Sequence, residues 1–117
     1  MVLQVNLSVL GVTKSQVNEL LNDLNSIQGV SARHLETKIE FKEICVPIII
    51  EIGGAIVIAV VANLITDRIK KFFDKEKSID NEPITIEYKN INIIQGDSKE
   101  KIENNVNIII NANDRKN

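Results

Sequence analysis

The sequence predicts an α+β domain. We expect a small sheet, built from a strand–helix–strand unit and a C-terminal hairpin, to pack with a long apolar central helix and a short C-terminal helix. Apolar residues alternate with polar ones near both ends of the chain, which is typical of strands with one wet face. Two other segments repeat apolar residues at spacings of three and four, as amphipathic helices do. The 117 residues suit one domain, which we expect to cover residues 1–112, with residues 113–117 forming a frayed tail.

The first 41 residues contain three predicted elements. Alternation from Leu3 to Val9 indicates a strand that ends at Gly11. Thr13 and Gln16 can form a capping box for a helix, which Gly29 would follow in a left-handed conformation. The apolar face of this helix comprises Val17, Leu20, Leu21, Leu24 and Ile27. Residues 30–41 fit either a strand or a loose linker, and we interpret them as a strand.

The central segment, residues 47–73, is the most distinctive part of the chain. One interpretation is a single helix of this length, with Pro47 in its first turn and basic residues near its end. Two adjacent glycines, Gly53 and Gly54, oppose it, because each costs about 1 kcal/mol relative to alanine in a helix interior. The alternative is a strand at Ile48–Ile52 followed by a helix from Ala55. The sequence fits both interpretations.

The C-terminal third predicts a hairpin and a helix. Ile84, Ile86 and Tyr88 alternate with polar residues, and a tight turn at residues 89–90 leads to a second alternating run. After a turn at Gly96, an apolar stripe predicts a helix over about three turns. The stripe comprises Ile102, Val106, Ile109 and Ile110.

Two stripes divide the central helix. The larger apolar residues are expected to pack on the sheet, and these are Val57, Ile58, Val61, Ile65, Ile69 and Phe72. The other stripe carries small residues, which allow a second helix to approach closely. This predicted assembly face comprises Ala55, Ala59, Ala62, Asn63 and Thr66. It predicts a homo-oligomer, unless the helix around Ile102 and Val106 covers the same face within one chain.

A membrane is the alternative environment for the central helix. The apolar residues favour insertion, while Glu51, Asn63 and the glycines oppose it by a similar amount. The expected location is the cytoplasm, with association with a membrane surface as an option. Arg68, Lys70 and Lys71 could contact anionic lipid headgroups or an acidic partner. The alternative function is a small membrane-active protein whose central helix inserts into the bilayer when triggered.

The residues give little support for catalysis. His34 and Cys45 each lack a second ligand or a catalytic partner nearby in sequence, so we expect no metal, no cofactor and no enzymatic activity. The net charge of −2 provides no general attraction to nucleic acid, which is not expected as a partner. Glu51 is a candidate pH switch, because burial raises the pKa of a carboxyl group. A small-molecule-binding regulatory domain on a ferredoxin-like sheet is a third option that no residue marks.

The layout resembles the effector-associated constant component family of bacterial conflict systems. The stretches that carry the resemblance are Val17–Leu24, Gly53–Ile65, Arg68–Phe73, Ile84–Tyr88 and the terminal apolar helix. The chain differs from the family pattern by lacking a Trp near the end of the central helix and a Pro-rich or Gly-rich linker. The resemblance implies a non-enzymatic component that partners an effector protein in prokaryotic immunity, and it carries over no catalytic residues.

Overall fold

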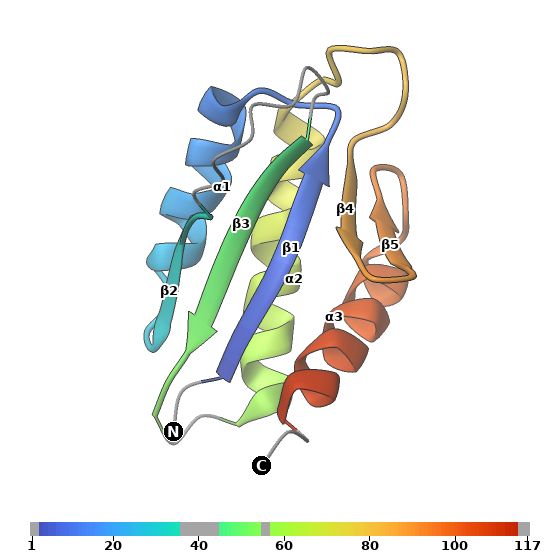
Figure 1. Cartoon of the computed structure of the whole chain (residues 1–117). Helices are drawn as coiled ribbons and strands as arrows, with labels where there is room; N and C mark the ends of the chain where they lie inside the picture. Colours follow the sequence, from blue (N-terminus) through green and yellow to red (C-terminus); the bar gives the residue numbers. More distant parts are fainter. Residues whose placement is uncertain (1–2, 36–44, 55–56, 115–117) are drawn as a thin grey trace.

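The computed structural model describes residues 3–35, 45–54 and 57–114, and it shows an α+β fold. In these residues, five strands form one antiparallel sheet and three helices cover one of its faces (Figure 1). The elements in chain order are β1 (Leu3–Leu10), α1 (Lys14–Asn25), β2 (Val30–His34), β3 (Cys45–Ile52), α2 (Ile58–Lys75), β4 (Thr85–Tyr88), β5 (Ile91–Ile94) and α3 (Lys99–Asp114).

The strand order β2-β3-β1-β4-β5 results from two interleaved β-α-β units. The first unit joins β1 to β2 through α1, and β3 lies between these two strands. The second joins β3 to β4 through α2, and β1 lies between them. Every neighbouring pair is antiparallel. The hairpin strand β5 and the helix α3 extend this arrangement at one side of the sheet (Figure 1).

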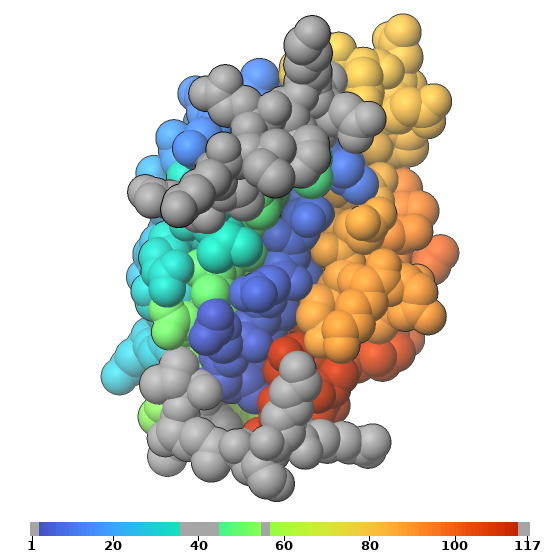
Figure 2. All heavy atoms as spheres, in the orientation of Figure 1, coloured from blue at the N-terminus to red at the C-terminus, as the bar shows by residue number. Residues whose placement is uncertain are grey.

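Alternation along the strands separates a buried face from an open one. Val5, Leu7 and Val9 of β1 are buried toward the helices, whereas Gln4 and Asn6 are exposed on the opposite face. Figure 2 views the molecule from this opposite side, where atoms of β1, β2 and β3 are visible. We call it the open face of the sheet.

The first helix begins where the capping box predicts, but it ends at Asn25, so Ile27 lies in the turn that follows. The capping box is present, because the Gln16 amide donates to Thr13 Oγ1 at 3.2 Å and the Thr13 amide donates to Gln16 Oε1 at 2.8 Å. The predicted apolar residues of the helix, from Val17 to Leu24, are buried. Of the weaker segment at residues 30–41, Val30–His34 forms β2, and residues 36–41 lie outside the described residues.

The single long helix from Pro47 is wrong, and the strand alternative is confirmed. Cys45–Ile52 forms β3 at the centre of the sheet, where it pairs with β1 and β2. Gly54 then has a φ of +90°, a left-handed conformation that ends the strand and would break a helix. Proline has no backbone N–H to donate, and Pro47 is tolerated in β3 because it lies opposite the residue that follows the end of β2 at His34. One bond remains there: the Leu35 amide donates to the Pro47 carbonyl at 3.0 Å.

The helix α2 begins at Ile58 and packs on the sheet through most of the predicted large stripe. Val61, Ile65, Ile69 and Phe72 are buried. Val57 is the exception, because it precedes the helix and is 66% exposed. The predicted packing of Val57 on the sheet is therefore wrong.

The C-terminal elements agree with the predicted hairpin and helix. Lys89 has a φ of +51° at the two-residue turn between β4 and β5. The helix α3 continues past the expected tail boundary to Asp114, and the Asn113 side chain donates to the Tyr88 hydroxyl at 3.0 Å. This contact explains why the helix includes Asn113. Residues 115–117 lie outside the described residues.

Candidate functional site

A surface groove of about 660 Å³ lies beside the first half of α2. Its lining residues come from three places in the sequence: the turn after α1, the turn after β3, and the helix α2 itself. They are Gln28, Gly29, Gly53, Gly54, Val60, Val61 and Leu64. Gln28 is the one polar side chain among these described lining residues, so the groove offers mainly apolar carbon and backbone to a partner.

Glycines build one wall of the groove. The Gly53 amide donates to the Gly29 carbonyl at 2.9 Å, which holds the turn after α1 against the end of β3. Gly29 and Gly54 have φ values of +85° and +90°, which side chains other than glycine rarely adopt. Because three lining residues have no side chain, a partner can approach the backbone closely.

Exposed apolar side chains flank this groove on α2. Val57 is 66% exposed and Val60 is 55% exposed, and Leu64 is half-buried beside them. The spacing of four places Val60 and Leu64 on one side of the helix, and Val57 directly precedes its first turn. Further along this side, Asp67 and Lys71 replace apolar residues. We call Val57, Val60 and Leu64 the α2 patch.

The predicted assembly face is divided between the interior and the surface of the chain. Ala62 and Thr66 have no exposed surface, and the Thr66 hydroxyl donates to the Ala62 carbonyl at 2.7 Å. Asn63 is exposed and donates to the Glu103 carboxylate of α3 at 3.3 Å. Ala59 is exposed, and Ala55 lies outside the described residues. Two of the four described residues of the stripe thus lie in the interior of the chain.

Two of the three predicted basic contact residues connect α2 with α1, and the third pairs within α2. Arg68 donates to the Asp23 carbonyl in the last turn of α1 at 3.3 Å and to Ser26 Oγ at 3.5 Å. This position suits a cation, because a helix C-terminus carries partial negative charge. Lys71 pairs with the Asp23 carboxylate at 3.7 Å, and Lys70 pairs with Asp74 at 3.5 Å. The two lysine side chains stay partly exposed in these pairs, and the contact of the three residues with lipid or an acidic partner stays a prediction.

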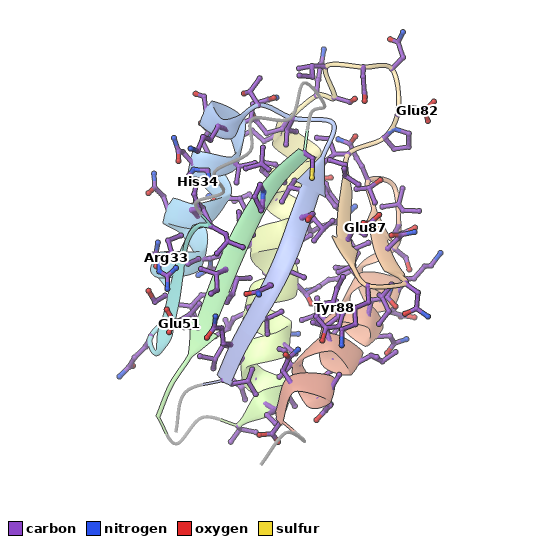
Figure 3. The ribbon with its side chains drawn as sticks, in the orientation of Figure 1. Arg33, His34, Glu51, Glu82, Glu87 and Tyr88 are labelled. Carbon is purple, nitrogen blue, oxygen red and sulfur yellow. The ribbon has the colours of Figure 1, made fainter. Side chains whose placement is uncertain are left out.

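Glu51 lies on β3 rather than in an apolar helix. Its carboxylate accepts from Arg33 Nη2 of β2 at 3.1 Å on the open face, where the two side chains lie next to each other (Figure 3). The position in a helix that suggested a pH switch is therefore wrong, and Glu51 forms a partly exposed ion pair between strands.

The titratable and nucleophilic groups do not converge. His34 Nε2 contacts Asn18 Oδ1 at 2.6 Å, and Cys45 lies at the start of β3 with a half-buried side chain. In the described ranges, no group of three or more His, Cys, Asp or Glu residues could hold a metal ion. Across the same residues, no helix combines the length and apolar character that crossing a membrane requires.

Sequence reasoning missed the groove. The signal that could have found it is the Gly53-Gly54 pair. If the helix starts after these glycines, Val57 lies just before its first turn and Val60 lies in that turn. Comparisons of the chain with protein-family models, with curated proteins and with solved structures found no match.

Proposed function

We propose that this chain is a non-enzymatic assembly component that self-associates through the α2 patch and its groove. The single observation that carries this proposal is the exposure of Val57 and Val60 beside a largely apolar groove. Clustered apolar side chains that remain exposed on one chain are typical of interaction surfaces. The proposed interface is on the central helix, as the sequence predicts. It uses the side of α2 next to the turn after α1 and not the stripe of small residues.

The proposed partner, besides a second copy, is an effector protein of a prokaryotic conflict system. Support for this part comes from the resemblance of the central and flanking segments to the effector-associated constant component family. It can be tested by co-expressing the chain with the product of a neighbouring gene and measuring whether the two elute as one complex in size-exclusion chromatography. Separate elution of the purified proteins at micromolar concentration would contradict the partnership.

The self-association is tested with a charge placed in the α2 patch. We expect the wild type to associate with rising concentration in sedimentation velocity, and Val60→Asp to weaken the dissociation constant at least about tenfold. The reason is that burying a valine contributes about 1.5 kcal/mol or more, and a buried unpaired carboxylate adds a further cost.

Ile108→Asp provides the matched control. Ile108 is 53% exposed on α3, so the substitution has the same chemistry and a similar starting exposure at another surface. We expect this variant to sediment as the wild type does. A wild type that stays monomeric across the micromolar range, or equal effects of both substitutions, would contradict the proposed interface.

A further inference from the structure

The outer edge of β2 faces away from the rest of the sheet. Bonds from Leu35 to Pro47 and from Gly53 to Gly29 fix the pairing pattern between β2 and β3. In an antiparallel pair, bonded and non-bonded positions alternate, so the backbone groups of Val30, Ala32 and His34 point outward. Ala32 is the central residue of this outer edge. Such outward groups are a template for pairing with a strand of another chain.

Asn25, the last residue of α1, occupies this central position. Its Oδ1 accepts from the Ala32 amide at 2.7 Å, and its Nδ2 donates to the Ala32 carbonyl at 2.8 Å. The side-chain amide thus makes the same two bonds that a neighbouring strand would make. The outward Val30 amide is bonded as well, to the Ile27 carbonyl at 3.1 Å.

The opposite edge of the sheet shows a related arrangement, in which Asp97 uses its side chain and its backbone amide. The register of the β4–β5 hairpin directs the backbone groups of Asn92 and Ile94 outward. The Ile94 amide donates to Asp97 Oδ2 at 3.0 Å, and the Asp97 amide donates to the Ile94 carbonyl at 2.9 Å. On each edge, one polar residue therefore bonds both backbone groups of one outward position.

We propose that Asn25 prevents β2 from pairing with the β2 strand of a second copy. Two β2 strands can meet antiparallel about a two-fold axis at Ala32, because that residue is the central outward position. The Asn25 side chain competes for both Ala32 bonds, so this pairing requires Asn25 to leave. This inference does not depend on the proposed function of the α2 patch.

The test removes the Asn25 amide in a Val60→Asp background, in which the α2 patch is disrupted. We expect Asn25→Ala to form concentration-dependent dimers in sedimentation velocity. We also expect its Ala32 amide to exchange with solvent about tenfold faster under monomeric conditions, the ratio that the loss of one hydrogen bond corresponds to. Because the α2 patch is disrupted in this background, dimers of Asn25→Ala cannot form through the interface of the proposed function. If the wild type is monomeric, the proposed function fails, but dimers of this variant would still support the role of Asn25.

Asn22→Ala is the control, since Asn22 is an exposed asparagine one turn earlier on α1. We expect it to behave as the background does. A folded Asn25→Ala variant that sediments like Asn22→Ala would overturn the proposal. If Asn25→Ala does not fold, hydrogen exchange of the wild type decides: protection of the Ala32 amide comparable to that of Arg33 supports the proposal, and exchange at the rate of an exposed amide overturns it.

Discussion

Gln95 connects three segments that are distant in sequence. Its Nε2 donates to the carbonyls of Phe73 at 2.7 Å and Glu76 at 2.9 Å, where α2 ends. Its Oε1 accepts from the Ile84 amide at 3.2 Å, just before β4. A single side chain thus satisfies backbone groups at the end of the helix and at the start of the hairpin. This arrangement fixes how the connector between them leaves α2.

Replacing Gln95 with glutamate should destabilise the fold strongly, although the two side chains have nearly the same shape. A carboxylate can still accept from Ile84, but it cannot donate to the two carbonyls and it adds negative charge at a helix C-terminus. We expect a loss of about 2–3 kcal/mol in the free energy of unfolding, measured by urea denaturation. Gln28→Glu, an exposed position, should change it by less than about 0.5 kcal/mol when both variants are measured in the Val60→Asp background, which disrupts the proposed α2 interface. Equal effects at both positions would contradict this role of Gln95.

His34 predicts how stability depends on pH. Burial lowers the pKa of His34 below its ordinary value of 6.5, and the nearby Lys14 ammonium lowers this pKa further. Its Nδ1 is buried and has no hydrogen-bond partner in the part of the chain that the structure describes. The folded state therefore favours neutral His34. As the pH falls below 6.5, the unfolded state takes up the proton first, so the folded state loses stability until the pH passes the lowered pKa.

The expected result is a decrease in the free energy of unfolding between about pH 7.5 and 5.5, above the range in which carboxyl groups titrate. His34→Gln should remove most of this decrease, because glutamine can keep a contact with Asn18 but does not titrate. Urea denaturation of both proteins at several pH values measures the effect. An identical slope for the variant would show that His34 does not contribute it.

At the scale of elements, local signals predicted most of the fold. β1, the start of α1 and the hairpin each carry their own periodicity, cap or turn residues, and the structure places them where these signals predict. The central segment was ambiguous, because a short continuous apolar run fits a buried strand and a buried helix equally well. What decides the outcome is non-local: β3 pairs on both sides, with β1 and with β2.

The candidate site was less predictable than the elements, for the same reason. The groove joins Gln28, Gly53 and Val60, which come from two separate turns and a helix and meet only in the folded chain. The contact of Asn25 with Ala32 likewise depends on the register of β2 with β3. Periodicity identifies which side of a helix is apolar, but it does not say which neighbouring element covers that side.

For the molecule as a whole, the contact between α2 and α3 determines which surface of α2 remains exposed. Lys99 of α3 pairs with Asp67 of α2 at 2.9 Å, and Asn63 donates to Glu103 one turn away. Ala62 and Thr66 are fully buried in the same chain. Small residues on α2 therefore serve close packing within the monomer, and the larger exposed residues of the α2 patch remain outside.

Two alanine-to-leucine substitutions on α2 distinguish packing within the chain from packing between chains. Ala62→Leu should lower the free energy of unfolding by about 1–3 kcal/mol, because the added atoms overpack a fully buried position. Ala59→Leu, at an exposed position, should change it by less than about 0.5 kcal/mol. Both are measured by urea denaturation at two protein concentrations in the Val60→Asp background, so that association through the α2 patch does not contribute. Since unfolding of a monomer does not depend on concentration, we expect the loss at Ala62 to be the same at both. A neutral Ala62→Leu together with a change of oligomeric state in Ala59→Leu would instead assign the small stripe to contacts between copies.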